Sequence, residues 1–307
     1  MANFLLIGGN GFIGSHILDV LLKNNHSVKV FDKNSEKYRP PIENIEYFLS
    51  DFNDKLALSE ALTDVDCVIH ALSTSIPSTS NKFPIQDIEG NLINTLNLLE
   101  IMVEKRINNI VFLSSGGTVY GVPEFLPVSE LHQTNPICSY GIVKLSIEKY
   151  LHLYSNMYEI NPTILRISNP FGPRQSHLGN QGFISTLLNN HLKGQYTKIF
   201  GDGSVIRDYI YISDVANVCY NATLSNKSGI FNVGSNSGYS LNDIIRISED
   251  IIGEKILVKY IEKRSFDIPE IVLDTSKINL ALNWQPTISI QDGILLYLNW
   301  LKENYYE

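Results

Sequence analysis

The sequence predicts an α/β fold in which a doubly wound parallel sheet is followed by a smaller mixed α/β part. Short apolar runs alternate with amphipathic helical patterns, a glycine-rich turn joins the first run to the first helix, and the pattern becomes irregular after residue 168. Apolar strands separated by helices are typical of a parallel sheet covered on both faces. The predicted strands are 4–8, 28–31, 67–72, 110–113 and 163–167, and the predicted helices are 12–23, 88–103 and 142–154.

We place a domain boundary between residues 168 and 169, where the turn-rich sequence NPFGPRQ begins. Residues 1–168 form the first expected domain and residues 169–307 the second, with helices predicted at 183–192, 241–252 and 290–302. The apolar segments DYIYI and IFNVG are typical of buried strands, so residues 205–235 are expected to return to the first sheet. A chain of 307 residues is long enough for two such domains.

Composition and charge exclude several classes of protein. The chain has 32 acidic residues against 24 Lys and Arg, a formal net charge of −8. Because nucleic acids are bound through clustered Lys and Arg, we expect no nucleic-acid partner. No apolar run approaches the roughly 20 residues that span a bilayer, and no signal-peptide pattern opens the chain, so we expect a cytoplasmic protein without a membrane partner. The three Cys and seven His show no disulfide or metal-ligand spacing, and no metal site is predicted.

The glycine-rich turn GGNGFIG predicts a dinucleotide site. Gly8, Gly11 and Gly14 lie between a strand and a helix, where a tight turn lets the backbone approach a pyrophosphate. The helix that begins at Phe12 and Ile13 would direct its first amides at this anion, as in Rossmann-type folds.

Acidic residues after the next two strands extend this site. Asp32 ends the second predicted strand, where a carboxylate accepts both ribose hydroxyls and repels a 2′-phosphate, so NAD is favoured over NADP although Lys33 follows. Asp51 either borders the adenine or caps a loop.

Tyr140 and Lys144 form the pattern YxxxK and share one face of a predicted helix. A phenol has a pKa near 10 and acts as a base at neutral pH when positive charge favours the phenolate. Lys144 and an oxidised nicotinamide would both supply that charge. The preceding predicted strand ends at Ser114 and Ser115, so hydroxyl groups are expected near this pair.

At this point the chain resembles the extended short-chain dehydrogenase/reductase family, in its branch of nucleotide-sugar epimerases and dehydratases. The resemblance covers essentially the whole chain and rests on GGNGFIG, Asp32, SSGGTVYG, YGIVK, RISNPFG, GDGSVIRDYIYISD and RSFD, in this order. It implies that Tyr140 is the proton acceptor and that Lys144 binds the nicotinamide ribose and lowers the tyrosine pKa. It also implies a homodimer formed by the helices around 88–103 and 139–154.

The resemblance implies further site residues. Asn91 would support the active-site end of its helix, Asn169 and Arg207 would bind a substrate diphosphate, and Arg264 and Asp267 would hold the diphosphate and the nucleotide ribose. The candidate catalytic residues are Tyr140, Lys144, Thr118 and Ser115. The candidate cofactor site comprises Gly8, Gly11, Phe12, Ile13, Gly14, Asp32, Asp51, Asn91, Ser114, Tyr140 and Lys144. The candidate substrate site comprises Thr118, Asn169, Arg207, Arg264 and Asp267.

The chain departs from the family pattern at Gly116, which stands where the family has a proton-relaying Ser or Thr. Either Thr118 or Ser115 supplies the hydroxyl from a neighbouring position, or Tyr140 contacts the sugar directly. A 4,6-dehydratase of this family would carry Asp and Glu where this chain has Gly117 and Thr118, so dehydration is not expected.

The function expected from this resemblance is NAD-dependent epimerisation at C4 of a nucleotide sugar through a transient 4-keto intermediate. A UDP-sugar is favoured over a dTDP-sugar, and glucose-type and N-acetylated sugars both stay open. Ile271 lies where the family gates the sugar pocket and, being smaller than Tyr, favours an N-acetyl group. The alternatives are an NAD(P)H-dependent 4-ketoreductase of a 4-keto-6-deoxy nucleotide sugar and a noncatalytic NAD-sensing protein.

Overall fold

The chain forms two compact units in the computed structural model, which describes residues 2–175, 182–225, 227–263 and 268–306. The first unit comprises Met1–Val119, Pro136–Arg166 and Ala216–Phe231, and the second comprises Tyr120–Asn135, Ile167–Val215 and Asn232–Glu307. The chain therefore passes between the units more often than a boundary near residue 168 and a return of residues 205–235 would require.

A seven-stranded sheet organises the first unit, in the order β10-β6-β5-β4-β1-β2-β3. The strands β1 to β6 follow the order 3-2-1-4-5-6 of a Rossmann fold, and β1 pairs in parallel with both β2 and β4. This arrangement confirms the predicted doubly wound α/β fold. The strands are β1 (Asn3–Ile7), β2 (Ser27–Asp32), β3 (Glu46–Leu49), β4 (Cys67–His70), β5 (Asn109–Ser115), β6 (Asn161–Ile167) and β10 (Gly229–Val233).

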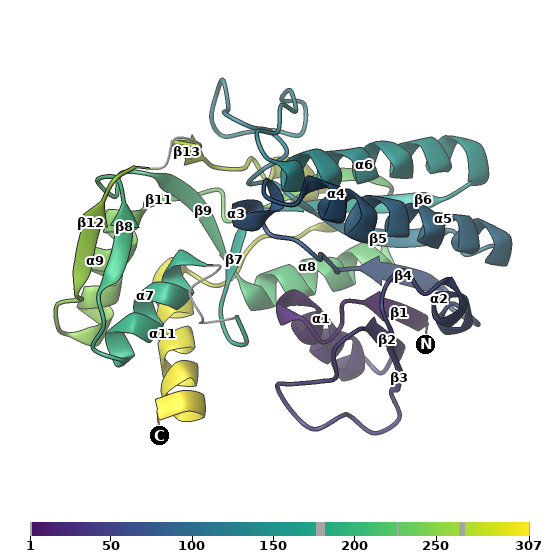
Figure 1. Ribbon diagram of the computed structural model, residues 1–307, viewed down its shortest axis with the longest axis horizontal. Coiled ribbons are helices and arrows are strands. Elements are labelled where there is room, and N and C mark those ends of the chain that lie inside the picture. Colours follow the sequence, from purple (N-terminus) through teal and green to yellow (C-terminus); the bar gives the residue numbers. More distant parts are fainter. Residues whose placement is uncertain (1, 176–181, 226, 264–267, 307) are drawn as a thin grey trace. The chain divides into compact units, whose positions relative to one another are not determined.

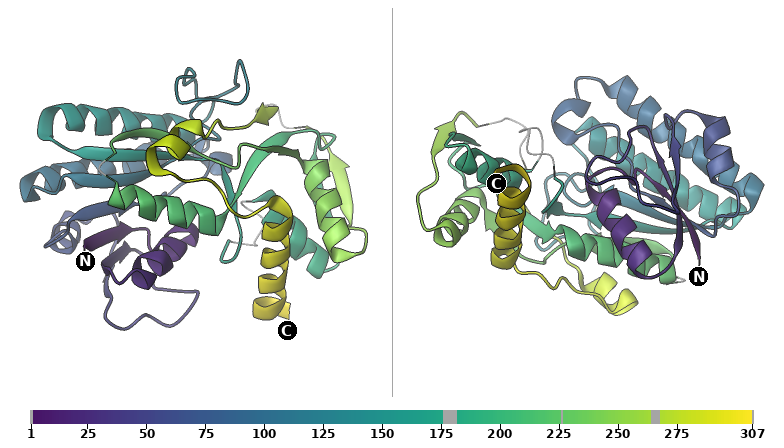
Figure 2. Two further views of the ribbon diagram at one scale, coloured as in Figure 1. Left: turned by 180° about the vertical axis from the view of Figure 1, so that it is seen from behind. Right: turned by 90° about the horizontal axis from the view of Figure 1, so that it is seen from below.

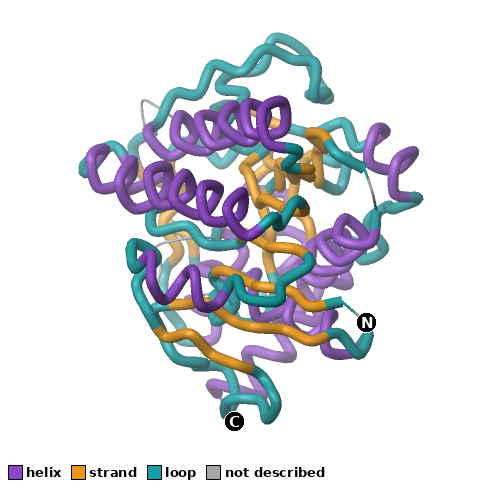
Figure 3. The backbone as a smooth tube through the Cα atoms, turned by 90° about the vertical axis from the view of Figure 1, so that its right-hand side faces the viewer, coloured by secondary structure: helices purple, strands orange, loops and turns teal. Residues whose placement is uncertain are grey.

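Helices cover both faces of this sheet. On one face α5 (Asn94–Lys105) and α6 (Ser139–Tyr158) run side by side (Figures 1 and 3). On the other face lie α1 (Phe12–Lys23) and α8 (Ile212–Leu224) (Figure 2). The core beneath α5 and α6 contains Leu5, Val68, Leu98, Phe112 and Ile147.

The region before α5 is more segmented than the sequence pattern predicts. Instead of one helix over 88–103, the chain forms α3 (Pro77–Ser80), α4 (Pro84–Asp87) and the π-helix η1 (Ile88–Ile93), which leads into α5. The sequence pattern also does not predict β3, a half-exposed edge strand, or α2 (Lys55–Ala61). Both are short, and strands and helices of this length carry little periodicity.

The second unit contains two small sheets. The strands β7 (Asn169–Phe171), β9 (Ile206–Tyr211), β11 (Gly238–Ser240) and β13 (Glu270–Ile271) form one, and β8 (Thr197–Phe200) with β12 (Val258–Ile261) forms the other. The helices are α7 (Phe183–Leu192), α9 (Leu241–Ile252), α10 (Ser276–Leu282), α11 (Ile290–Leu301) and η2 (Lys302–Tyr306). None of the helices in the described residues is long and apolar enough to cross a membrane.

Residues 205–235 do not return to the large sheet as a whole. Strand β10 pairs with β6 in that sheet, whereas β9 pairs with β7, β11 and β13. Both segments are buried, as their apolar sequences predict. Burial alone does not determine which of two sheets a strand joins.

Candidate active site

The glycine turn after β1 has the close packing that a dinucleotide site needs. Gly8 has a φ of +82°, and a Cβ there would lie 2.8 Å from the backbone of Leu72. A Cβ on Gly14 would collide with the carbonyl oxygen of Gly8, so the start of α1 packs directly on the turn. Helix α1 begins after Gly11 with no side-chain cap and no acidic residue in its first turn, which includes Phe12 and Ile13. Its N-terminal dipole therefore favours an anion.

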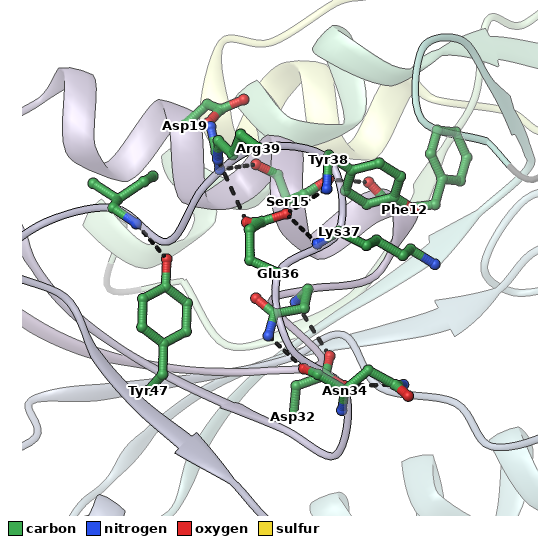
Figure 4. A network of polar contacts seen from close by, with 12 residues as sticks. Phe12, Ser15, Asp19, Asp32, Asn34, Glu36, Lys37, Tyr38, Arg39 and Tyr47 are labelled. Atoms are coloured by element: carbon green, nitrogen blue, oxygen red, sulfur yellow. Dashed lines mark hydrogen bonds and ion pairs between the residues drawn. The ribbon is translucent and has the colours of Figure 1, made fainter. Parts of the chain in front are cut away.

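Asp32 closes this site at the carboxyl end of β2. Its side chain is 6% exposed and accepts hydrogen bonds from the backbone amides of Asn10, at 3.1 Å, and Asn34, at 3.0 Å (Figure 4). An ionised carboxylate offers about four acceptor positions, so Asp32 keeps acceptor capacity for ribose hydroxyls.

The loop after Asp32 is fixed to α1 by an ion-pair network (Figure 4). Arg39 pairs with Asp19 of α1 and lies 3.4 Å from the carboxylate of Glu36. Lys33 is the basic neighbour of Asp32 that the sequence indicates, and Arg39 is a second basic residue on the same loop. Two carboxylates already pair with the Arg39 guanidinium, so its charge is partly neutralised.

Asp51 lies beyond the end of β3 and caps its own turn. Its carboxylate accepts the backbone amide of Asn53 at 3.2 Å, which is the loop-cap alternative from the sequence.

Tyr140 and Lys144 lie on the first turns of α6, where Tyr140 is half-buried and Lys144 is buried. The Lys144 ammonium donates to the carbonyl of Leu113 at 2.9 Å and lies 5.8 Å from the centroid of the Tyr140 ring. Burial lowers the pKa of Lys144 to about 8. The nearby carboxylates of Asp87 and Glu148 have the opposite effect and raise this pKa, but less than burial lowers it.

The pKa of Tyr140 is raised to about 12, chiefly by burial and further by Cys138 and Asp87. In the chain alone, burial therefore raises this pKa, and the lowering that we expected from Lys144 is not among its causes. The side chains of Ser73 and Ser115 act in the opposite direction and lower the pKa of Tyr140 in part.

The candidate hydroxyls after β5 therefore differ in their environment. Ser115 lowers the pKa of Tyr140, whereas Thr118 Oγ1 is buried without a hydrogen-bond partner in the structure. Ser114 points elsewhere, because its hydroxyl donates to Glu148 of α6 at 2.5 Å. Of the three, Ser115 is the one that acts on the Tyr140 phenol.

Asn91 supports the loop beside Tyr140. Its side-chain oxygen accepts the Thr74 amide at 2.8 Å, and its amino group donates to Asp87 Oδ1 at 3.0 Å. Ser73 and Asp87 were not among the predicted site residues. They are separated from Tyr140 by more than 50 residues, and no sequence motif marks them.

The second unit holds two of the predicted substrate residues. Asn169 on β7 donates to the carbonyl of Asp208 at 2.9 Å, and Arg207 precedes Asp208 on β9. Since Asn169 pairs in register with Tyr209, Asn169 and Arg207 are on the same face of these strands. Arg264 and Asp267 lie outside the described residues.

Comparisons with known proteins agree with this arrangement. The sequence model of the NAD dependent epimerase/dehydratase family matches residues 4–234. A Methanocaldococcus jannaschii protein, provisionally named a UDP-glucose 4-epimerase, is 39% identical over 306 residues, which cover 98% of each chain. The solved UDP-glucose 4-epimerase of Thermotoga maritima with UDP-glucose has a TM-score of 0.94 and 31% identity, covering 98% of this chain and 99% of that one.

A second solved structure binds a different sugar nucleotide. The UDP-N-acetylglucosamine 4-epimerase of Methanobrevibacter ruminantium, in complex with UDP-N-acetylmuramic acid, has a TM-score of 0.93 and 28% identity, and the match covers 98% of both chains.

This chain belongs to the NAD dependent epimerase/dehydratase family. The predicted family, the enzyme class and the NAD cofactor are thereby confirmed. The glycine turn, the uncapped start of α1 and Asp32 fit NAD, because they combine a close backbone approach, an anion-favouring helix end and a ribose acceptor.

Proposed function

We propose that this protein is an NAD-dependent 4-epimerase of a nucleotide sugar, with a UDP-sugar as substrate. The observation that carries the proposal is the group of half-buried Tyr140 and Ser115 with buried Lys144, in the same unit as the glycine turn. The names of the similar proteins support it, since they are 4-epimerases of UDP-sugars.

The cofactor is held by the first unit. Gly8, Gly11 and Gly14 would take the pyrophosphate, Asp32 the adenosine ribose, and Lys144 the nicotinamide ribose. When bound, NAD supplies a reversible hydride acceptor for C4 of the sugar, which permits a transient 4-keto sugar.

Tyr140 is the proposed general base and acid. It would remove the proton from the C4 hydroxyl and later return it to the C4 oxygen. The hydride taken from C4 would return to the opposite face of C4, so the reaction has no net oxidation. Ser115, which lowers the pKa of Tyr140, relays the proton in place of the missing hydroxyl at Gly116. The Lys144 ammonium favours the phenolate by its charge.

The substrate would be retained through groups that do not react. We assign Asn169 and Arg207 to the diphosphate. Arg264 and Asp267, which lie outside the described residues, are assigned to the diphosphate and the nucleotide ribose. Arg suits this role because its planar fork meets phosphate oxygens bidentately. Ile271 is buried and pairs in register with Arg207, and its small size favours a pocket that admits an N-acetylated sugar.

The decisive experiment uses the purified protein without added cofactor. It should retain NAD and interconvert UDP-glucose with UDP-galactose, or the N-acetylated pair, with product followed by NMR. Deuterium at C4 should remain in the epimerised sugar. A strict requirement for stoichiometric NADH or NADPH would contradict the proposal and indicate a ketoreductase.

Ser115→Ala should lower kcat by about 10²-fold, because a positioned proton-transfer group contributes roughly 10²–10⁴-fold. Thr118→Val, a variant of similar shape, should have a smaller effect, since Thr118 does not contact Tyr140 through a hydrogen bond. Steady-state kinetics of both variants check this. An unaffected Ser115→Ala with an impaired Thr118→Val would transfer the relay to Thr118.

Asp32→Ala should weaken NAD binding by about tenfold or more, because it removes a charged acceptor for two ribose hydroxyls. Substrate binding in the NAD-saturated enzyme should change much less. Calorimetric titration of apoprotein measures the first effect and KM the second. Unchanged NAD affinity would refute the ribose assignment.

We also propose a homodimer formed through α6 and the η1–α5 region. Apolar side chains are exposed along these helices: Ile88, Ile93, Ile142, Leu153 and Met157. An exposed apolar stripe on adjacent helices is typical of a protein interface. Sedimentation should show a dimer, and Leu153→Glu with Met157→Glu should shift it to monomer. A monomeric parent protein would contradict this proposal.

A further inference from the structure

Asp87 is a buried carboxylate to which the proposed mechanism gives no role. It is the last residue of α4, directly before η1, and is 2% exposed. Burying a charged group is costly unless it is hydrogen-bonded. Asp87 accepts hydrogen bonds from the side chains of Ser75, Ser139 and Asn91, at 2.6, 2.7 and 3.0 Å. Donors from three segments therefore converge on one carboxylate.

Two of these donors adjoin Tyr140 and a residue that lowers its pKa. Ser139 directly precedes Tyr140 and donates to Asp87 Oδ2. Ser75 donates to Asp87 Oδ1, and its carbonyl accepts the hydroxyl of Ser73, which lowers the pKa of Tyr140. The two oxygens of one side chain thus join the start of α6 to the loop that carries Ser73.

Neutral contacts hold the same junction. The backbone amide of Ser139 donates to Asn81 Oδ1 at 2.8 Å, and that of Tyr140 donates to Ser80 Oγ at 3.1 Å. These side chains satisfy amides that a helix start leaves without a helical partner. Asp87 is the charged member of this set, and hydrogen bonds to an ionised acceptor are roughly twice as strong as neutral ones.

We propose that Asp87 is a positioning residue that holds the start of α6, and with it Tyr140, against the loop that carries Ser75, and that its negative charge sets the pH range in which Tyr140 acts. The inference rests on the proposed function, because it takes Tyr140 as the base. Asp87 acts through Ser139 and Ser75 and makes no contact with the reacting atoms.

The second part of the proposal, the effect of the Asp87 charge on the pH range of Tyr140, depends on the charged and titratable groups around Tyr140. Cys138 and Asp87 both raise its pKa, and the Lys144 ammonium lies 5.8 Å from its ring centroid. Lys144 in turn interacts with Asp87, Glu148 and His70. Neutralising Asp87 removes one cause of the raised Tyr140 pKa, so the phenolate should form at lower pH. The acidic limb of the kcat profile should then move to lower pH.

Two substitutions separate geometry from charge. In Asp87→Asn one oxygen remains for Ser75 and Asn91, and the new amino group can donate to the Ser139 hydroxyl, so the geometry is kept without the charge. Asp87→Ala removes both the hydrogen bonds and the charge. Asp54→Asn is the matched control, because Asp54 also accepts a serine hydroxyl, from Ser50 at 2.8 Å, but does so at the start of α2.

The experiment compares these variants by kcat–pH profiles and by NMR titration of ¹³C-tyrosine protein, with the Tyr140 signal assigned through Tyr140→Phe. Asp87→Asn should shift the acidic limb and the Tyr140 pKa downward by about one unit. Asp87→Ala should lower kcat by about 10–100-fold, as expected for a displaced catalytic group. Asp54→Asn should change neither.

The outcomes distinguish this inference from the proposed function. If the parent protein does not epimerise, the proposed function fails, while the NMR titration still tests the influence of Asp87 on Tyr140. If the parent protein epimerises but Asp87→Asn leaves both the pH limb and the Tyr140 pKa unchanged, the inference about charge is wrong. Should Asp87→Ala not fold, Ser139→Ala tests the positioning part, and an unchanged kcat there overturns it.

Discussion

Tyr140→Phe should lower the turnover of the proposed epimerisation by about 10²–10⁴-fold, the usual contribution of a positioned general acid–base group. The substitution removes one oxygen and leaves the ring over which the Lys144 ammonium lies. NAD binding should therefore stay nearly unchanged, and the loss should appear in kcat. The measurement is steady-state kinetics of the NAD-saturated enzyme together with titration of NAD.

A tyrosine elsewhere on the same helix provides the control. Tyr150 of α6 is 38% exposed and lies outside the proposed site, so Tyr150→Phe should retain full turnover. Retention of normal turnover by Tyr140→Phe would remove the central residue from the proposed mechanism.

Arg166→Met should lower the free energy of unfolding by about 3–5 kcal/mol, because it leaves a buried carboxylate without its partner. The Arg166 guanidinium contacts Glu148 in several places, the closest at 2.6 Å, and both side chains are at most 3% exposed. Glu148 also accepts the Ser114 hydroxyl. The Arg166–Glu148 pair therefore links β6 to α6, and Ser114 adds β5, the strand that ends at Ser115. Urea denaturation measures the loss.

Two further variants show whether the buried charge is the cause. Adding Glu148→Leu to Arg166→Met should recover much of the loss, since no charge is then left unpaired. Arg246→Met breaks an exposed pair with Asp243 and should cost no more than about 1 kcal/mol. Equal losses of unfolding free energy in Arg166→Met and Arg246→Met would show that leaving Glu148 unpaired costs no more than breaking an exposed ion pair.

Features that depend on neighbouring residues were predictable from the sequence. The helix predicted at 12–23 is found as α1 with the same bounds, because its amphipathic pattern begins directly after the glycine turn. Tyr140 and Lys144 were placed together by their spacing on one helix. Asp32 was placed beside the glycine turn, since adjacent parallel strands bring their carboxyl ends to one edge of the sheet.

Contacts between distant segments were not predictable in this way. The sequence left Ser115, Thr118 and direct contact by Tyr140 as alternatives, and it assigned no site role to Ser73 or Asp87. Strand β9 was expected in the large sheet, but its pairing with β7 places it in the other unit.

The sequence alone determined the glycine turn, the acidic residue beside it and the Tyr–Lys pair, because each depends on short spacings that secondary structure converts directly into geometry. Only the tertiary structure decided which carboxylate links the start of α6 to the loop that carries Ser75. Those contacts join a loop and a helix start, and their distances are set by how these elements pack.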